Sequence, residues 1–507
     1  MDKKKICLII LIIFLSQTIQ LISWINKDSS NPAWDQSWHA MISTNKYMQL
    51  FGKTNLTTEQ IEEIYPIFRF ANNYYPPFYH ISTVPFYIVF GNNYDSALLT
   101  NLFFLFILIV SSFFIGKKLY NAEAGLVISF IISTIPIHSL LMRDYLIDFS
   151  LSAMVALGFV LLLYTDHFEN IKYSLLFGLA FGLGILTKWS YPIYLIIPLC
   201  YSLYTFFRKN FYEKKNYNKI KNIVFPLILT IVTASIWYTF SKIKILIPTI
   251  LMYSKKGFVE GDPSFSSTSG LTHYFNIIIN DYSFFYFIIF VISMIFLIKN
   301  FKESKTKTML LLQIVFIYIF FTILSNKDAR YILPVYIFLA LFAGEFITNL
   351  DKKKIKYLFI FIIVIFGFLQ NFSYNSKNID FDYQIGRIKL IDLKGKYPST
   401  GEFNIKEMLD NINNSNNKNS FSLCIASESS QLNDVNIPYN AMIENYPVSK
   451  MIGNGCNPLE FDYTLVGPIK ETWRSNTFKS SKSMLEQNKK NFKEIYSLGE
   501  VTIYEKK

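Results

Sequence analysis

The sequence predicts a mainly α-helical, polytopic membrane bundle followed by a small α/β domain. Of the 507 residues, 51% are hydrophobic and only 17% are charged, against roughly 25% charged residues in a soluble domain. The apolar residues fall in runs of about 20, the length that crosses a hydrocarbon layer about 30 Å thick. Beyond about residue 373 these runs stop. A soluble enzyme, a secreted toxin and a fibrous protein are therefore excluded.

The apolar runs predict about 11 transmembrane helices. The first run, Ile6 to Trp24, follows three lysines and precedes no small-residue cleavage site, so it is interpreted as a retained signal anchor with a cytoplasmic N-terminus. Residues 1–372 then form the membrane domain, and residues 373–507 form a domain outside. The ten further spans are predicted at 96–116, 121–138, 147–165, 171–187, 190–207, 222–241, 282–298, 308–325, 330–349 and 355–372.

The net charge of +13 follows from this topology. Lys and Arg gather between apolar runs, at 117–118, 208–221, 299–307 and 352–354. With a cytoplasmic N-terminus all four clusters lie in cytoplasmic loops, as the positive-inside rule requires. A nucleic-acid partner would instead need the charges on one face, so none is expected.

Two segments outside the membrane are predicted to carry structure. The first external loop, 25–95, contains the apolar stretch Phe78 to Gly91, which is too short to span and is expected to be an interfacial helix. In the C-terminal domain, strands are predicted at 421–426, 463–466 and 501–504, a helix at 481–492 and a loop at 411–420. An oxidising exterior would permit a disulfide between Cys424 and Cys456. The sequence alone does not show whether the two cysteines are close in space.

The segment Trp34 to His39, WDQSWH, holds the first candidate for chemistry. Asp35 lies between two aromatic residues just after the first span, and a partly desolvated carboxylate is a better general base than an exposed one. The alternative is an ordinary interfacial acid beside tryptophans of the aromatic belt.

Two cations break the positive-inside pattern. Lys188 and Arg330 fall at the predicted external ends of spans, where a charge is costly unless it is paired or binds an anion such as a phosphate or carboxylate. Snorkelling of Lys188 and pairing of Arg330 with Asp328 are the alternatives. Asp148, in the segment Arg143 to Asp148, would either neutralise one of these cations or position a sugar hydroxyl.

Several absences narrow the function. The sequence has no P-loop, no HExxH, no GxSxG and no GxGxxG motif at a strand-to-helix turn. Of five scattered histidines, only His39 and His80 share a loop, and the cysteines lack metal spacing. No metal site and no cofactor are therefore expected, and a divalent ion has no support in the sequence.

Five motifs in this order resemble the GT-C superfamily of membrane glycosyltransferases, specifically the group of protein O-mannosyltransferases and lipid A aminoarabinose transferases. The resemblance covers nearly the whole chain. Its residues are Asp35, Tyr75 to His80 (YPPFYH) with Phe90-Gly91, Arg143 to Asp148 (RDYLID), Gly182 to Lys188 (GLGILTK) and Arg330 to Pro334 (RYILP). The tail, including Asp462 to Pro468, is similar to the tails of bacterial members.

The resemblance implies an enzyme of the bacterial cytoplasmic membrane that glycosylates cell-envelope components. It implies transfer of a sugar from a polyprenyl-phosphate donor to an acceptor protein, lipid or glycan on the non-cytoplasmic face, with inversion. Asp35 would be the base, and Lys188, Arg330 and Tyr331 would hold the lipid phosphate. The other expected substrate-binding residues are Gln36, His39, His80, Arg143 and Asp148.

One departure and two alternatives accompany this interpretation. Many relatives have Asp-Glu where this chain has Asp35-Gln36, and Gln can neither act as a second base nor ligate a metal strongly. A polysaccharide polymerase or ligase acting on lipid-linked oligosaccharides would share the same physics. A flippase or transporter of lipid-linked sugars would instead carry its site near the midplane between repeated halves.

Overall fold

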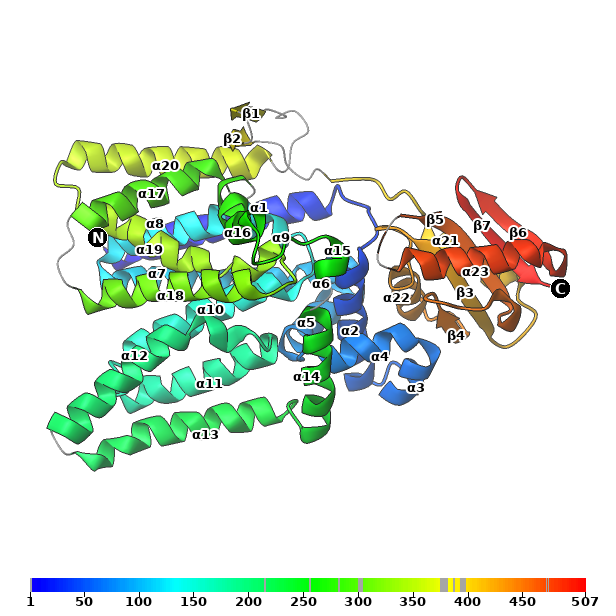
Figure 1. Ribbon diagram of the computed structural model, residues 1–507, viewed down its shortest axis with the longest axis horizontal. Helices are drawn as coiled ribbons and strands as arrows, with labels where there is room; N and C mark the ends of the chain where they lie inside the picture. The colour runs from blue at the N-terminus through cyan, green and yellow to red at the C-terminus, as the bar shows by residue number, and fades with distance from the viewer. Residues whose placement is uncertain are drawn as a thin grey trace. The chain divides into compact units, whose positions relative to one another are not determined.

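The chain forms two compact units in a computed structural model, drawn in Figure 1. The structure describes residues 2–213, 216–254, 257–280, 283–299, 304–373, 382–385, 388–392, 398–470, 472 and 474–507. The remaining residues, which include part of the predicted basic loops and much of the stretch 374–397 in the predicted C-terminal domain, lie outside the described residues. Unit 1 comprises Met1–Asn26, Pro76–Tyr79 and Asn101–Tyr397, and unit 2 comprises Lys27–Tyr75, His80–Thr100 and Pro398–Lys507.

Unit 1 is a bundle of helices with one small β-hairpin. A helix is present at each of the eleven predicted spans, several of them shorter than a full crossing. The helices are α1 (Lys3–Ile25), α7 (Thr100–Leu119), α8 (Ala122–Thr134), α9 (Pro136–Leu141), α10 (Ile147–Tyr164), α11 (Ile171–Thr187), η1 (Tyr191–Tyr194), α12 (Ile196–Phe207), η2 (Arg208–Glu213), η3 (Tyr217–Ile220), α13 (Lys221–Ser235), α14 (Phe240–Ser254), α15 (Gly257–Glu260), α16 (Thr268–Asn280), α17 (Phe284–Lys299), α18 (Lys305–Ile323), η4 (Ala329–Ile332), α19 (Val335–Thr348) and α20 (Lys353–Ser373), and the hairpin is β1 (Asp382–Ile385) with β2 (Ile388–Asp392).

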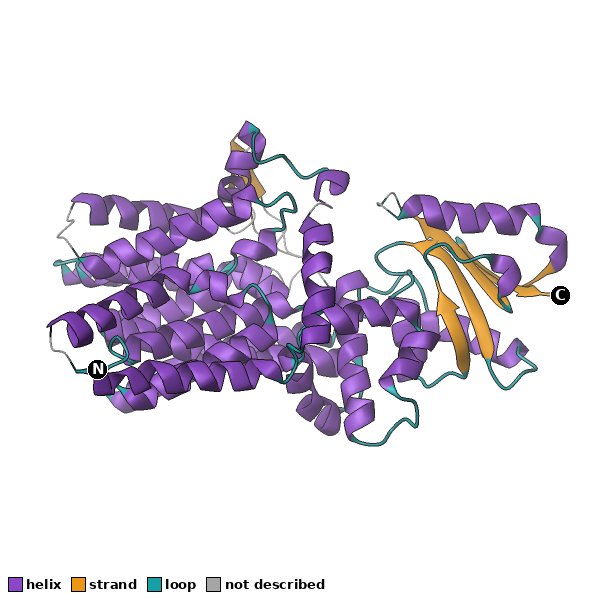
Figure 2. Cartoon of the chain, turned by 60° about the horizontal axis from the view of Figure 1, so that its bottom comes forward, coloured by secondary structure: helices purple, strands orange, loops and turns teal. Residues whose placement is uncertain are grey.

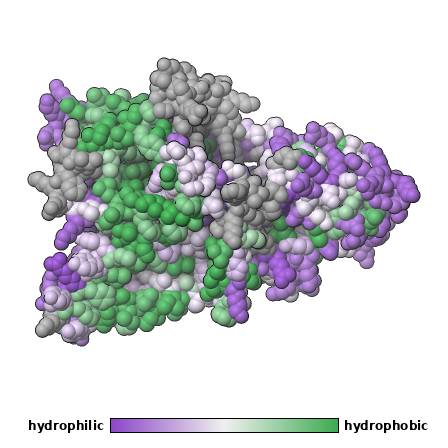
Figure 3. All heavy atoms as spheres, in the orientation of Figure 1, coloured by the Kyte–Doolittle hydropathy of each residue, from purple (hydrophilic) through white to green (hydrophobic). Residues whose placement is uncertain are grey.

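The helices of unit 1 identify an integral membrane protein. Among the described residues, five helices are long and apolar enough to cross a bilayer: α1, the continuous span Tyr94–Leu119 that includes α7, α10, α18 and α20. Their outward side chains are apolar, as at Leu11, Val315 and Phe361, and hydrophobic residues cover much of the face of the bundle drawn in Figure 3. Lipid is the solvent that such a surface requires.

One end of the bundle collects the basic loops. Ile6 at the start of α1 packs with Phe113 near the end of α7 and with Leu126 at the start of α8, so the lysines next to these residues share an end. At the same end Lys356 pairs with the carboxylate of Glu123. Lys307 lies 2.5 Å from Glu345 at the last turn of α19. The described residues in or next to the basic clusters at 117–118, 299–307 and 352–354 therefore lie at one end of the bundle, and their cytoplasmic location stays a prediction.

The glycines of the GLGILTK motif have a packing role. A Cβ on Gly182 would lie 2.7 Å from Thr233 of α13, and a Cβ on Gly184 would lie 2.3 Å from the buried ring of Tyr191. Both distances are far below van der Waals contact, so only glycine lets the Thr233 side chain and the Tyr191 ring lie this close to the α11 backbone. The last turn of α11, directly before Lys188, is fixed by these contacts.

Unit 2 combines the first loop after α1 with the α/β domain. Its helices are α2 (Trp34–Leu50), α3 (Thr58–Ile64), α4 (Pro66–Tyr74), α5 (Phe78–Phe90, of which the first two residues fall in unit 1), α6 (Tyr94–Leu98), α21 (Ile405–Ser415), α22 (Asn436–Ile443), η5 (Pro458–Glu460), α23 (Ser475–Gln487) and η6 (Lys489–Asn491). Its strands are β3 (Phe421–Glu428), β4 (Val448–Ile452), β5 (Tyr463–Ile469), β6 (Phe492–Leu498) and β7 (Val501–Lys506).

The strands of unit 2 form one mixed sheet in the order β4-β3-β5-β7-β6. β3 pairs in parallel with β4 and β5, whereas β7 pairs antiparallel with β5 and β6. Helix α23 packs on the sheet (Figure 2), where Leu485 contacts Ala426 of β3 and Val466 of β5. The predicted small α/β domain is therefore confirmed, as is the helix at Phe78–Phe90.

Cys424 and Cys456 form a disulfide, with their Cα atoms 5.7 Å apart. The bond ties β3 to the segment after β4 across a sequence separation of 32 residues. A loop of this size confers roughly 3–4 kcal/mol of stability. We expect Cys424→Ser combined with Cys456→Ser to lower the Tm of the full-length protein by about 10 °C or more, measured by scanning fluorimetry. Replacing the free cysteines Cys7 and Cys200 is the control, and an equal Tm in both double variants would contradict the stabilising role.

Candidate functional site

Asp148 and Lys188 form a buried ion pair in unit 1. Asp148 lies in the first turn of α10, and Lys188 directly follows the last residue of α11. Because residues 165–170 connect the two helices as a short turn, the start of α10 and the end of α11 meet. The Lys188 Nζ lies 2.7 Å from Asp148 Oδ1, with side chains 13% and 4% exposed. Both charges also suit the helix dipoles, an anion at an N-terminus and a cation at a C-terminus.

Arg330 extends this ion pair into a cluster of four charges. It lies in η4, and its Nη1 is 3.8 Å from Asp148 Oδ2. Its Nε donates a hydrogen bond to Asp328 Oδ2 at 2.8 Å, and its Nη2 lies 2.5 Å from the same oxygen. Burial raises the pKa of the Asp328 carboxyl, but the charge and hydrogen bonds of Arg330 outweigh burial, and the pKa is lowered. Asp328 is therefore ionised and holds the guanidinium.

Tyr331 adds an aromatic face to the cluster. The Lys188 Nζ lies 5.3 Å from the centre of the Tyr331 ring, a cation–π distance. The Tyr331 hydroxyl donates to Asn326 Oδ1 at 2.9 Å. The backbone carbonyl of Tyr331 accepts from the hydroxyl of the buried Tyr194 at 2.7 Å. Tyr194 and Asn326 were not singled out from the sequence, because neither breaks a composition pattern.

The four charges sum to zero. Asp148 contacts both predicted cations, so the structure supports the interpretation that it neutralises them. The pairing of Arg330 with Asp328, given above as the alternative to anion binding, is also present. The cluster lies at the start of α19, whereas Glu345 and the basic end lie at its last turn. For a helix of 14 residues these ends are about 20 Å apart. The cluster is thus at the end of the bundle opposite the basic loops.

Two further motifs meet near this cluster in unit 1. Tyr79, from YPPFYH, packs its ring 4.8 Å from that of Tyr145, from RDYLID. The Tyr79 hydroxyl donates to Asn101 Oδ1, and Asn101 Nδ2 donates to the carbonyl of Met142. Arg143 follows directly and is buried, with 4% of its surface exposed. The structure therefore joins motifs that are far apart in the sequence.

The second group of candidate residues lies in unit 2. Asp35 is in the first turn of α2, and His39 follows four residues later, on the same face of the helix. His39 Nδ1 lies 3.0 Å from Nε2 of His80 of α5, and both side chains are buried. In such a pair one ring nitrogen donates and the other accepts. The two histidines therefore cannot both be protonated on their facing nitrogens.

Gln36 has a structural role at the start of α2. Its Oε1 accepts hydrogen bonds from the backbone N–H of Ala33 at 2.9 Å and from the Tyr94 hydroxyl at 3.3 Å. The first bond caps the helix N-terminus, because the N-cap residue Ala33 has no polar side chain of its own. Gln at this position thus stabilises the helix that carries Asp35.

Within the described residues, no group of three His, Cys, Asp or Glu side chains is arranged to hold a metal ion. His39 and His80 provide two nitrogens that bind each other. The chemistry that the described residues offer is a carboxylate on α2 and two cations next to an aromatic ring in unit 1.

Residues 75–238 match the family model of the dolichyl-phosphate-mannose-protein mannosyltransferases. This segment contains the YPPFYH, RDYLID and GLGILTK motifs, and it excludes Asp35 and Arg330. A comparison with curated proteins found no match.

Solved structures share the fold at low sequence identity. ArnT from Cupriavidus metallidurans bound to undecaprenyl phosphate matches with a TM-score of 0.60 and 12% identity, over 97% of each chain. Its apo state matches with a TM-score of 0.60 and 13% identity, again over 97% of each chain. The Archaeoglobus fulgidus oligosaccharyltransferase tethered with an acceptor peptide matches with a TM-score of 0.53 and 11% identity, over 100% of this chain and 74% of the other. In fold along almost its whole length, and in sequence over residues 75–238, the chain is similar to membrane glycosyltransferases of the GT-C superfamily.

Proposed function

We propose that this protein transfers a sugar from a polyprenyl-phosphate donor to an acceptor on the non-cytoplasmic face of the membrane, with inversion at the anomeric carbon. The observation that carries the proposal is that Lys188 and Arg330 both contact Asp148, and that Lys188 lies over the Tyr331 ring. This group lies at the end of the bundle opposite the basic loops. The match to the mannosyltransferase family model and the fold shared with ArnT support it. The acceptor is a protein, a lipid or a glycan.

Asp35 is the general base in this proposal. The acceptor hydroxyl attacks the anomeric carbon and gives its proton to the Asp35 carboxylate, while the bond between that carbon and the phosphate oxygen breaks. The products are the glycosylated acceptor and the polyprenyl phosphate. Placement in the first turn of α2, on the face that carries His39, gives the carboxylate a rigid support.

Lys188 and Arg330 stabilise the leaving phosphate. Negative charge grows on the phosphate as the bond breaks, and fixed cations in a poorly hydrated site stabilise it with little reorganisation. Asp148 and Asp328 hold the two cations in place before the donor arrives, because a buried charge without a partner is costly. The polyprenyl chain adds binding energy that is equal in the ground and transition states, so it does not accelerate the reaction.

The proposed function also requires a particular membrane topology. We infer about 11 membrane spans, an N-terminus in the cytoplasm and a C-terminal domain outside, in the cytoplasmic membrane of a bacterium. The shared end of the basic loops supports this orientation through the positive-inside rule. Incubating the purified protein with radiolabelled polyprenyl-phosphate sugars and membrane extract tests the activity. A labelled acceptor is the expected result, and transport of the donor across vesicles without a product would favour a flippase instead.

Removing either cation should weaken phosphate binding. We expect Lys188→Ala and Arg330→Ala each to lower the affinity for a polyprenyl phosphate about 10- to 100-fold, because each removes a charge-assisted hydrogen bond. A thermal-shift titration of the full-length protein measures this loss.

Two control variants separate charge from packing. Asp148→Asn removes an anion from the same cluster but keeps an oxygen that can accept from Lys188 and hold it in place, so affinity for the phosphate should be kept or increased. Lys356→Ala removes a paired lysine at the opposite end of the bundle and should leave affinity unchanged. If Asp148→Asn weakens binding as much as Lys188→Ala does, the cluster is a structural support and not a phosphate site.

A further inference from the structure

The segment that leads into α2 is held by the C-terminal part of unit 2. The backbone N–H of Ser29 donates to the carbonyl of Ser399 at 2.9 Å, and the N–H of Ser399 donates to Asp28 Oδ1 at 2.8 Å. Asn31 Nδ2 donates to the carbonyls of Phe403 at 2.8 Å and Gln431 at 3.3 Å. We call these contacts, with the contact of Asn436 described next, the clamp.

Asn436 completes the clamp at the residue where the chain turns into α2. Its Nδ2 donates to the carbonyl of Pro32 at 3.3 Å, and the same carbonyl accepts from the Ser37 hydroxyl at 2.9 Å. Its Oδ1 accepts from the N–H of Asn433. Asn436 is fully buried, so its amide has defined partners on both sides. Pro32 is three residues before Asp35.

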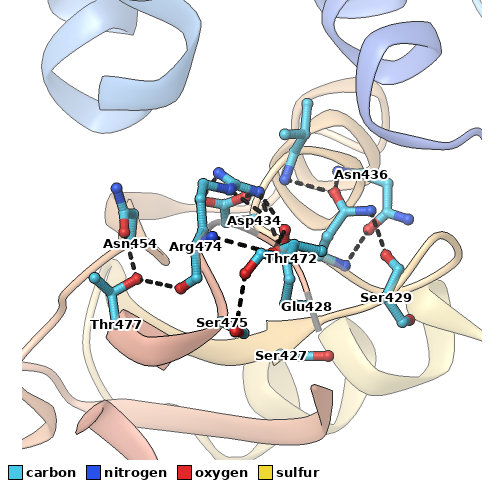
Figure 4. A network of polar contacts seen from close by, with 12 residues as sticks. Ser427, Glu428, Ser429, Asp434, Asn436, Asn454, Thr472, Arg474, Ser475 and Thr477 are labelled. Carbon is cyan, nitrogen blue, oxygen red and sulfur yellow. Dashed lines mark hydrogen bonds and ion pairs between the residues drawn. The ribbon is translucent and has the colours of Figure 1, made fainter. Parts of the chain in front are cut away.

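The position of Asn436 is fixed in turn by a buried charge cluster, shown in Figure 4. The Arg474 guanidinium lies between Glu428 at the end of β3 and Asp434, two residues before Asn436. Its Nη2 is 2.8 Å from Glu428 Oε2 and 2.9 Å from Asp434 Oδ1. The three side chains are at most 8% exposed. Helix α22 therefore starts from a point anchored to the sheet.

From these contacts we propose that Asn436 is a positioning residue for Asp35: the C-terminal domain sets the place of the α2 N-terminus, and with it the carboxylate, through the Asn436–Pro32 hydrogen bond. The inference rests on the proposed function of Asp35 as the base. Asp35 lies in the first helical turn after the clamp, so a shift of Pro32 moves the carboxylate directly. A misplacement of about 1 Å can cost on the order of 100-fold in rate.

Asn436→Asp tests this contact with a minimal change. The variant keeps the Oδ1 acceptor for Asn433 and replaces the donor to Pro32 with an oxygen. In alkaline solution the ionised carboxylate repels the Pro32 carbonyl, and we expect kcat to fall about 10- to 100-fold while the KM for the lipid donor stays the same. In mildly acidic solution the protonated carboxyl can again donate to Pro32, so the ratio of variant to wild-type kcat should rise toward one.

The control is Asn440→Asp, one turn further along α22. Asn440 donates to the carbonyl of Asn436 and takes part in none of the contacts that define the clamp, so kcat should stay near that of the wild type. The inference is overturned if Asn436→Asp has wild-type kcat, if both variants lose kcat equally, or if kcat, Tm and donor binding fall together. Should Asp35→Asn be fully active, the proposed function fails; should it be inactive while Asn436→Asp is normal, only this inference fails.

Discussion

Asp35→Asn should reduce transfer about 100- to 10,000-fold while the protein still folds and binds its lipid donor. This is the range that a general base contributes, and the substitution keeps the size of the side chain and one of its two acceptor oxygens. Turnover of a radiolabelled polyprenyl-phosphate sugar measures kcat, and a thermal-shift titration with the polyprenyl phosphate measures binding.

Glu59→Gln is the matched control for this experiment. Glu59 is also an acid in the first turn of a helix of unit 2, α3, and its side chain is exposed, so the variant should turn over like the wild type. Near-wild-type turnover in Asp35→Asn would remove Asp35 from its role and leave the charged cluster of unit 1 as an ion-pair network without a base.

Arg474→Met should destabilise the C-terminal domain by about 3–5 kcal/mol, the cost of leaving a buried charge without its partner. Glu428 and Asp434 would then face each other with no cation between them. We expect residues 398–507 of the full-length protein to be proteolysed faster. The loss of the intact domain is measured by immunoblotting with an antibody against a C-terminal tag. Lys406→Met, which removes an exposed ion pair with Glu444, should leave the rate of proteolysis close to that of the wild type.

The loss of stability of the C-terminal domain in Arg474→Met should depend on pH. Burial raises the pKa of both Glu428 and Asp434, although Arg474 opposes the increase. Without the arginine these pKa values rise further. An acid whose pKa is raised in the folded state costs nothing while it is protonated in both states, and it lowers the stability as the pH rises through the folded pKa. The loss of stability in Arg474→Met should therefore be small in acid and largest in alkaline solution. A loss that is constant with pH would indicate lost packing. Adding Glu428→Gln and Asp434→Asn to Arg474→Met should restore stability.

The membrane part of the fold was predictable because its signal is local. Apolar runs and the spacing of lysines are read within a few residues, and helices lie at each of the predicted spans. The eleven spans stay a prediction, because several helices, such as α12 and α19, are shorter than a full crossing. In η1 and η4 the chain makes a 3-10 turn before the helix proper, and hydropathy does not detect that difference.

The contacts of the candidate sites were predictable only in part. Lys188 and Arg330 stood out because cations at that position break a rule, but the sequence left open which partner Asp148 takes. The Arg474 cluster gave no signal, because its partners are 46 and 40 residues away. In the C-terminal domain the predicted loop at 411–420 was wrong over its first half, where α21 continues to Ser415, and the predicted helix at 481–492 begins earlier, at Ser475, and ends at Gln487.

The ion pair between Asp148 and Lys188 has a consequence for how the protein is made. α10 and α11 are joined by a short turn, so a ribosome delivers them one after the other as a helical hairpin, with the acid at its first residues and the lysine just after its last. Inserted together, the two charges cancel at the open end of the hairpin, opposite the turn that joins the helices. Inserted separately, each helix would have to drag an uncompensated charge through hydrocarbon. The pair thus favours insertion of α10 and α11 as one body, well before Arg330 has been synthesised.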